Sequence, residues 1–317
     1  MWSKLKSFKN SVPILKFVWG PKTLKRRFRS RYREFCKIYC RRRYKDILFE
    51  EQFGHKINWK RPSDLNEVIN FLSLKKESSE WTKLADKYLV RQYVQEKGLE
   101  HILVPLYGVW DTVDEIDFDI LPQDYVIKTN CSSGDAIIIQ GGTDNHKRAL
   151  IRSRLLESLS TYKKLFNDTA EYHYLTIPPK IIAERLLTKP QEIIDYKIWC
   201  LQGEPFGIFT VTDRDIQTHK ANYAFFDTNW KNHPEWLAEC FRNDNPVRKP
   251  TQIENMLLYA KCLSEGFPQV RVDFYEVHGQ IYFGEMTFTS ACGRMNYLSS
   301  EVLVQMGNLA LPENVRD

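Results

Sequence analysis

The feature that most constrains how this chain can fold is a pair of alternating segments near its C-terminus. Residues 270–277 and 280–288 each alternate in character along their length. His278-Gly279 lies between them, and glycine tolerates the positive φ that a tight hairpin turn requires. The pattern predicts a β-hairpin around which the rest of the chain can be organised.

The predicted hairpin gathers charged side chains on one face. In-register pairing across so short a turn would bring Asp273 near Glu285, and Arg271 lies two residues earlier on the same face. With the Thr287 hydroxyl, the two carboxylates offer the oxygen ligands that Mg²⁺ prefers. The alternative is a solvated hairpin face with a surface ion pair, because charged residues usually lie at the surface.

Positive charge is concentrated at the start of the chain. Residues 1–50 contain sixteen Lys or Arg but only three acidic residues, whereas the formal charge of the whole chain is +6. Apolar and aromatic residues are interleaved with these cations, and Gly20-Pro21 would divide the arm into two helical pieces. We expect a basic amphipathic arm that binds an anionic membrane surface. Packing on the body or on a second subunit is the next alternative, and nucleic acid is the least favoured.

The rest of the composition fits a cytoplasmic protein. The 317 residues, of which 43% are hydrophobic, suffice for two domains or for one domain with a smaller lobe. Seven cysteines without a CxxC pair indicate a reducing compartment. Neither a signal peptide nor a run of 18 apolar residues is expected, so a membrane location would be peripheral, on the inner face.

The body alternates predicted helices and strands. Capped or amphipathic patterns predict helices from residue 63 to 74, at 84–97, 148–166 and 253–264. Apolar or alternating runs predict strands at 102–104, 107–110, 125–129, 137–140, 180–187, 193–201 and 206–212. The segment 218–250 is rich in Asn, Asp, Trp and Pro, and we interpret it as a long loop with helical fragments that could act as a substrate lid.

A lysine and a small-residue loop suggest an anion site. Lys128 stands inside the apolar strand YVIKT, where it would face either a bound anion or the solvent at a sheet edge. Directly after it, residues 130–136 (NCSSGDA) could offer backbone N–H and hydroxyl donors to phosphates. The loop lacks the GK[ST] ending and the following helix of a Walker loop.

The order of these motifs resembles the ATP-grasp superfamily, and in particular its TupA-like branch from surface polysaccharide gene clusters. The resemblance covers about residues 62–293 through PSDLNE, LADKYLVRQYV, VPxxGVW, YVIKTNxxSGD, IIAERLL, DYK and RVDFY…FGEMTFT. It implies an α+β, ATP-grasp fold, in which two α+β lobes with antiparallel sheets clasp ATP beside a basic helical N-terminal arm. The implied domains are an arm (1–58), a reduced pre-ATP-grasp region (59–124), a small lobe (125–187) and a large lobe with the metal site (188–317).

The resemblance also implies a role for individual residues. ATP phosphates would be bound by Lys128, Lys197 and Lys87, and by the loop that contains Ser132, Ser133 and Gly134. The adenine would meet a hinge formed by Glu184, Arg185, Leu186 and Leu187, with Asp195 reaching the ribose. Two Mg²⁺ would be held by Asp273, Glu285 and Thr287. Arg271 would stabilise the anionic transition state, and Arg214 would neutralise transferred or incoming negative charge.

Two positions depart from the common pattern of the superfamily. Most ATP-grasp sites have Asn where this chain has Thr287, although the TupA-like branch resembles this chain there. The branch tends to have His-Gly where this chain has Cys131-Ser132, and losing that glycine restricts the approach of the backbone to phosphate.

The implied activity is an ATP-dependent carboxylate–amine ligase that proceeds through an acyl phosphate and yields ADP and phosphate. Its substrates would be a saccharide carboxylate, such as that of a uronic acid in a bacterial surface polysaccharide or its precursor, and an amino acid or amino sugar. One alternative is a phosphotransferase or glycosyltransferase, because Asp213-Arg214-Asp215 and Asp117-Phe118-Asp119 match a D-x-D pattern. Another is a non-catalytic protein that binds membrane surfaces through the arm. The sequence leaves the oligomeric state open.

Overall fold

The computed structural model describes residues 21–75, 79–189, 192–212, 221–243 and 245–311. By its internal contacts the chain divides into two units, Met1–Lys56 and Ile57–Asp317. No helix among the described residues is long and apolar enough to span a membrane.

The first unit contains two helices, α3 (Pro21–Tyr39) and α4 (Arg41–Phe53). The helical arm predicted from the sequence is therefore present from residue 21, whereas the piece before Gly20 lies outside the described residues. A break at Cys40, which has an extended φ of −134°, separates the helices. Helix α4 ends at Gly54, whose φ of 78° suits a glycine C-cap.

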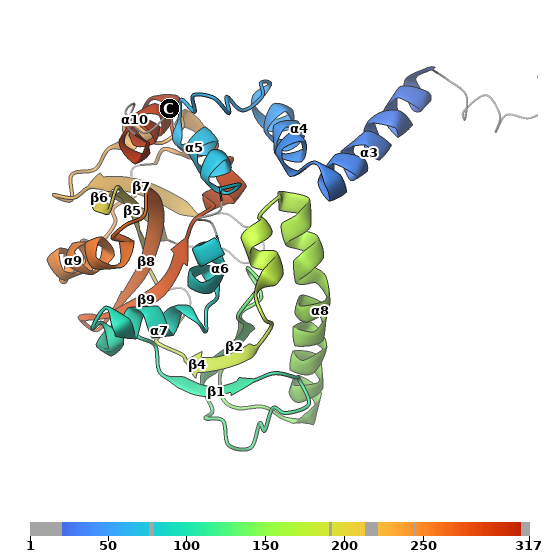
Figure 1. Cartoon of the computed structure of the whole chain (residues 1–317). Helices are drawn as coiled ribbons and strands as arrows, with labels where there is room; N and C mark the ends of the chain where they lie inside the picture. Colours follow the sequence, from blue (N-terminus) through green and yellow to red (C-terminus); the bar gives the residue numbers. More distant parts are fainter. Residues whose placement is uncertain (1–20, 76–78, 190–191, 213–220, 244, 312–317) are drawn as a thin grey trace, which may run out of the picture. The chain divides into compact units, whose positions relative to one another are not determined.

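The second unit contains two antiparallel sheets (Figure 1). The smaller sheet has the order β1-β4-β2-β3 and consists of β1 (Leu106–Trp110), β2 (Tyr125–Thr129), β3 (Ile137–Ile139) and β4 (Ile181–Arg185). Helix α8 (Asn145–Thr169) packs Ile151 and Leu155 against Tyr125 and Ile127 of this sheet. The Asp144 carboxylate caps α8 by accepting the Lys147 N–H at 2.7 Å.

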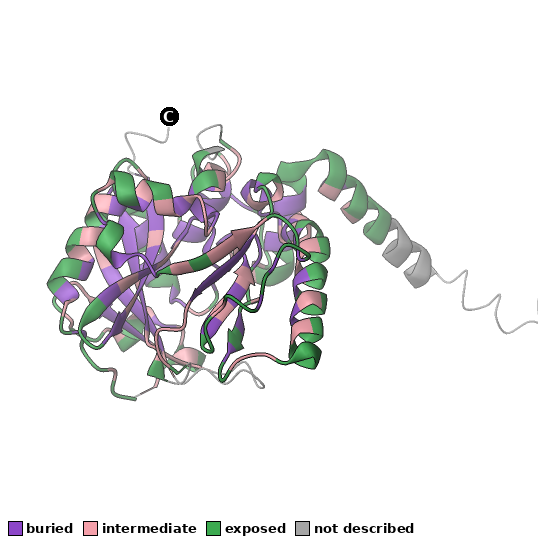
Figure 2. Ribbon diagram, turned by 90° about the horizontal axis from the view of Figure 1, so that it is seen from below, coloured by how far each residue is buried: buried purple, intermediate pink, exposed green. Residues whose placement is uncertain are grey.

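The larger sheet has the order β7-β6-β5-β8-β9. Its strands are β5 (Asp195–Leu201), β6 (Glu204–Thr212), β7 (Asn222–Asp227), β8 (Gln269–Val277) and β9 (Gln280–Thr287). Helix α9 (Ile253–Ser264) packs on one face, where Ile198 and Val272 join the core. Helices α5 (Leu65–Leu72) and α10 (Ser300–Ala310) pack on the other face, around Trp199. Figure 2 shows that buried residues concentrate in the strands and exposed residues on the outer sides of the helices.

Three predicted elements differ from the structure. The helix predicted at 84–97 is two helices, α6 (Ser79–Ala85) and α7 (Val90–Glu96), because Asp86 Oδ1 accepts the N–H groups of Tyr88 and Leu89 and interrupts the helical ladder. The segment 102–104, which was predicted to be a strand, is not one: residue 102 is the last residue of a 3₁₀ turn, Glu100–Ile102. Finally, the loop predicted at 218–250 contains β7, an edge strand of the larger sheet, so its residues 222–227 do not form a lid.

Candidate active site

The hairpin of β8 and β9 contains an extra residue that decides which side chains share a face. From the turn inward, Tyr275 pairs with Tyr282 and Phe274 with Phe283, but Asp273 then pairs with Glu285 and leaves Gly284 without an opposite residue. The turn residues His278 and Gly279 both have positive φ, 52° and 76°, as the sequence predicted for a two-residue connection. A strict two-residue hairpin would have placed Gly284, and not Glu285, opposite Asp273.

This bulge brings the second carboxylate to the site. With regular alternation Glu285 would point to the same side as Phe283, which lies in the core under α9. With the extra residue, Phe283 and Met286 both lie in that core, and Glu285 reaches the face of Asp273. Glycine suits position 284, because a Cβ there would be crowded, at 3.0 Å from the Asp273 carbonyl oxygen and 3.2 Å from Tyr275 Cε2.

Asp273 is the buried centre of a charged cluster. Its side chain is 1% exposed. Lys197 Nζ donates to Oδ2 at 2.6 Å, while Arg271 donates from Nε to Oδ1 and from Nη2 to Oδ2, each at 2.7 Å. Burial alone would raise the pKa of Asp273, but Arg271 and Lys197 outweigh burial and hold this pKa below its ordinary value. The carboxylate is therefore charged at neutral pH.

Arg271 links Asp273 to the other polar side chains of the hairpin face. Its Nη2 also donates to Glu285 Oε1 at 3.2 Å and to Thr287 Oγ1 at 3.0 Å, and its Nη1 donates to Ser290 Oγ at 3.1 Å. Burial would lower the pKa of this guanidinium, but Asp273 and Glu285 raise the pKa above its ordinary value. Arg271 is thus a fixed cation with four partners.

A second charged cluster lies on the smaller sheet. Glu184 on β4 accepts from Lys128 Nζ on β2 at 2.5 Å and lies 3.5 Å from Arg91 Nη1 on α7. Lys128 therefore does not point to open solvent from a sheet edge, since its side chain is only 20% exposed. Sequence reasoning missed Arg91, although it stands one helical turn after Lys87 in the LADKYLVRQYV motif.

The small-residue loop is held in place by hydrogen bonds of partly buried side chains. Lys87 Nζ donates a short hydrogen bond to the Ser132 carbonyl, and the Asp135 carboxylate accepts from Thr129 N–H at 2.9 Å and from Ser158 Oγ at 2.9 Å. Cys131 is fully buried, so it is a core residue and not a phosphate contact. This burial raises the pKa of its thiol to about 11.

The exposed part of the loop consists of the residues predicted to meet phosphate. Ser133 and Gly134 are exposed, whereas the Ser132 side chain is 6% exposed. Gly134 has a φ of 72°, which glycine adopts at little cost. The predicted contact of Lys87 with phosphate competes with its present bond to the loop carbonyl.

The predicted hinge follows the smaller sheet. Arg185 ends β4, its N–H donates to the Pro105 carbonyl at 3.0 Å, and its guanidinium donates to the Tyr282 hydroxyl on β9. Leu186 and Leu187 come directly after the strand and are partly buried. The bond between Arg185 and Tyr282 ties the end of the smaller sheet to the hairpin of the larger one.

Of the two remaining predicted residues, the structure describes Asp195 but not Arg214. Asp195 lies on the same face of β5 as Lys197, with its Oδ2 3.5 Å from Lys197 Nζ, as the alternation predicted. Arg214 lies outside the described residues, together with the Asp213-Arg214-Asp215 motif.

Tyr275 is a site residue that sequence reasoning missed. Burial raises its pKa well above the ordinary value, and the carboxylates of Asp195, Glu285, Asp273 and Glu184 raise it further. Tyr275 pairs with Tyr282 of β9, close to the Asp273–Glu285 pair in the register of the hairpin. Its position two residues after Asp273, on the same face of the strand, was the signal that could have identified it.

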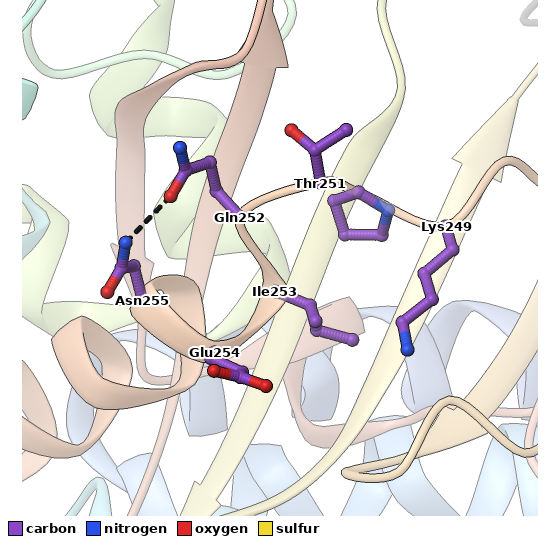
Figure 3. Close-up of a pocket in the computed structure, with 7 residues that line it drawn as sticks. Lys249, Thr251, Gln252, Ile253, Glu254 and Asn255 are labelled. Carbon is purple, nitrogen blue, oxygen red and sulfur yellow. Dashed lines mark hydrogen bonds between the residues drawn. The ribbon is translucent and has the colours of Figure 1, made fainter.

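Two surface hollows of the second unit contain none of these residues. One has a volume of about 450 Å³ and is lined by residues 249–255; there Asn255 Nδ2 donates to Gln252 Oε1 at 2.7 Å (Figure 3). The other, of about 580 Å³, is lined mainly by an acidic segment, 114–119, and by α8, with Arg148 and Arg152 as its cations. The charged clusters, and not these hollows, are the candidate site.

A family model matches most of the second unit. The model, described as TupA-like ATPgrasp, covers residues 67–310, and so includes both sheets and every described residue of the candidate site. This chain belongs to the TupA-like ATP-grasp family. The family assignment confirms the resemblance and the fold class inferred from the motifs, and ATP-grasp enzymes use ATP and Mg²⁺.

Solved structures of ATP-grasp ligases are among the chains similar to this one. D-alanine–D-alanine ligase from Bacillus anthracis is 14% identical, with a TM-score of 0.40 over 74% of this chain and 69% of that one. The enzyme of the same name from Helicobacter pylori is 12% identical, with a TM-score of 0.42 over 79% and 70%. D-cycloserine synthetase DcsG is 13% identical, with a TM-score of 0.40 over 80% and 85%. A comparison with curated proteins finds no match.

The donor set of this ATP-grasp protein fits Mg²⁺. Asp273, Glu285 and Thr287 present carboxylate and hydroxyl oxygens on one face, and Glu285, at 42% side-chain exposure, is the member of the acidic pair that solvent reaches. No group of three or more His, Cys, Asp or Glu that could hold a metal occurs in the part of the chain that the structure describes. Two carboxylates with water and phosphate oxygens are the usual coordination for Mg²⁺ in nucleotide sites.

Proposed function

We propose that this protein is an ATP-dependent carboxylate–amine ligase that forms an amide bond and releases ADP and phosphate. The observation that carries the proposal is the Asp273–Glu285 pair on a buried strand face, where Lys197 and Arg271 lie within hydrogen-bond distance of Asp273. An acidic pair next to fixed cations suits a reaction in which two anions, a carboxylate and a triphosphate, must approach one another.

In the first step, an oxygen of the acceptor carboxylate attacks the γ-phosphorus of ATP, and the bond to the bridging oxygen of ADP breaks. The products are an acyl phosphate and ADP. Lys128 and Lys197 bind the triphosphate oxygens, and Arg271 stabilises the charge that develops in the transition state. Asp273, Glu285 and Thr287 would hold Mg²⁺, which would supply charge neutralisation for the phosphates.

In the second step, the neutral amine attacks the acyl carbon, phosphate leaves with the electron pair of the carbon–oxygen bond, and the amine nitrogen loses a proton. Arg271 is suited to hold the departing phosphate because it is buried, permanently charged and fixed by four partners. Water must be kept from the acyl phosphate, and the buried surroundings of Asp273 support this.

The substrate class is proposed from the resemblance to the TupA-like branch. We propose that the carboxylate belongs to a uronic acid of a bacterial surface polysaccharide or its precursor, and that the amine belongs to an amino acid or amino sugar. What supports this is membership in the TupA-like branch. The roles of Glu184 to Leu187 in adenine binding and of Asp195 in ribose binding are part of the same proposal.

The test uses the full chain with Mg-ATP and a panel of uronic acids, amino acids and amino sugars. The proposal expects ADP and phosphate only when a carboxylate and an amine are both present, and a hydroxamate when hydroxylamine replaces the amine. Release of AMP and diphosphate, or transfer of phosphate to a sugar hydroxyl, would overturn it. Asp273→Asn should abolish turnover, whereas the matched surface variant Asp119→Asn should retain it.

The glycosyltransferase alternative gains no support from the described D-x-D segment. Asp119 is paired with Arg148 at 2.7 Å, and the Asp117 carboxylate accepts the Asp119 N–H at 3.0 Å. The Asp119 carboxylate therefore has a partner on α8, and the Asp117 carboxylate has one within its own segment.

A further inference from the structure

Helix α3 of the first unit carries a row of exposed apolar side chains. Phe35, Ile38 and Tyr39 are 52%, 63% and 71% exposed, and Tyr32 is 44% exposed. These positions are three or four residues apart, so they lie along one side of the helix. The ring centroids of Phe35 and Tyr39 are 5.2 Å apart, so these two side chains are neighbours within the row.

The neighbouring helix does not use this row for packing. Helix α3 meets α4 through other positions: Cys36 is 1% exposed, Arg33 donates to both carboxylate oxygens of Glu51 at 2.7 Å, and Arg33 also lies 5.8 Å from the centre of the Tyr44 ring. Tyr32 lies in the exposed row and also contacts α4, because its hydroxyl accepts a hydrogen bond from Arg43 at 3.1 Å. The α3–α4 pair is therefore held together while Phe35, Ile38 and Tyr39 remain exposed.

Exposed cations border the row. Arg31 precedes Phe35 by one helical turn, and Arg41 and Arg42 follow Tyr39 at the start of α4; all three are exposed. They belong to the segment 1–50, which contains sixteen Lys or Arg and only three acidic residues. A helix side that joins aromatic and apolar groups to arginines matches the boundary between lipid headgroups and acyl chains.

We propose that α3 docks on an anionic lipid surface, with Phe35, Ile38 and Tyr39 inserted among the headgroups and Arg31, Arg41 and Arg42 facing lipid phosphates. Lipid fits better than nucleic acid, which would bind the arginines but leave Phe35 and Ile38 hydrated. It also fits better than a second copy of the arm, which would bring like charges together. The proposal is independent of the ligase chemistry.

The experiment measures co-sedimentation of the full chain with phosphatidylcholine vesicles, with and without phosphatidylserine. Binding should require phosphatidylserine and weaken with salt. Arg31→Gln with Arg42→Gln should weaken binding by about fivefold for each lost charge. In salt, the triple variant Phe35→Ser, Ile38→Ser, Tyr39→Ser should lose most of the vesicle binding that the wild-type chain retains.

Matched controls come from α8, which also exposes apolar and basic side chains. Leu150→Ser with Leu156→Ser, and Lys147→Gln with Arg154→Gln, alter residues of the same kinds and should leave vesicle binding unchanged. Equal loss in the α8 variants, no loss in the arm variants, or binding to duplex DNA in place of vesicles would each overturn the proposal. ATP turnover in the absence of vesicles should be unchanged in the arm variants, which separates this result from the fate of the ligase proposal.

Discussion

Lys197 Nζ lies 2.6 Å from Asp273 Oδ2, although the two residues are 76 positions apart in the chain. The contact exists because β5 and β8 are neighbours and their register pairs Lys197 directly with Asp273. Together with Arg271, Lys197 occupies both carboxylate oxygens. Oδ2 accepts from Lys197 and from Arg271 Nη2, whereas Oδ1 accepts from Arg271 Nε, so a carboxylate lone pair remains for a metal. Movement of Lys197 to a bound phosphate would make Oδ2 available as well.

We predict that Lys197→Met weakens both the fold and the binding of nucleotide. Asp273 keeps Arg271 as a partner, so we expect a loss of about 1–3 kcal/mol in the free energy of unfolding. The affinity for Mg-ATP should fall at least tenfold, by about 1.4 kcal/mol or more. Urea unfolding and calorimetric titration measure the two effects. Lys147→Met, an exposed position on α8, should change neither, and an unchanged ATP affinity in Lys197→Met would remove this lysine from the site.

The lowered pKa of Asp273 predicts the pH dependence of stability. A carboxylate whose folded pKa is below its unfolded value, about 3.9, stabilises the fold above that value and loses this contribution as the pH falls through the folded pKa. Wild type should therefore exceed Asp273→Asn in Tm by a constant amount between about pH 5 and 7, and the gap should shrink in stronger acid. A gap that widened in acid would show that the carboxylate is protonated in the folded state.

Glu184 is predicted to tolerate the loss of one cation but not of two. Lys128→Met and Arg91→Met should each cost about 1 kcal/mol, because the other cation still compensates the carboxylate. The double variant should cost about 3–5 kcal/mol, since it leaves a buried charge without a partner. Adding Glu184→Gln should recover most of that loss. Strict additivity of the single variants would mean that the two cations act on different groups.

The bulge predicts different outcomes for two glycines of the same hairpin. Gly284→Ala should cost about 1–3 kcal/mol through overpacking and should abolish ATP turnover, because it displaces Glu285 from its place opposite Asp273. Gly279→Ala has free space but a positive φ of 76°, so it should cost about 1–2 kcal/mol and leave turnover intact. Similar turnover in the two variants at a temperature where both are folded would contradict this role of the bulge.

The buried cysteines are predicted to be inert. Burial raises the pKa of Cys131 to about 11 and that of Cys200 to about 12, whereas Cys40 and Cys240 are exposed. Iodoacetamide at pH 8 should therefore label the two exposed thiols first, as peptide mass spectrometry would show. Early labelling of Cys131 would mean that the small-residue loop opens in solution.

The local patterns of the sequence predicted most elements of the second unit. Helix 253–264 begins and ends where its amphipathic pattern does, and the hairpin turns at His278-Gly279. The missed strand β7 is an edge strand that lies in a polar, Asn-rich stretch, and its pairing with β6 decides its conformation. The split of the helix predicted at 84–97 depends on hydrogen bonds of Asp86, whose side chain also binds Asn130, far away in the sequence.

The sequence predicted which charged side chains share a strand face, but it did not predict their partners on strands far away in the sequence. Alternation placed Asp195 with Lys197, and Asp273 with Arg271, because each pair is two residues apart on one strand. The partner of Lys128 could not be predicted in this way, since Glu184 meets it only through the order of the smaller sheet. Arg91 and Tyr275 were missed although their spacing from Lys87 and Asp273 was a local signal for each of them.

The surplus residue in β9 has a consequence for comparing this protein with its relatives. In a regular hairpin with a two-residue turn, two residues on opposite strands whose side chains share a face are separated along the chain by an odd number of positions. Asp273 and Glu285 are separated by an even number, because the bulge adds one residue. A relative that keeps both acids but lacks one residue between them would have the odd spacing of a regular hairpin, and it would place both carboxylates on one face without a bulge. The parity of the spacing, read from an alignment, thus indicates which relatives need a bulge in this strand to bring the two acids opposite one another.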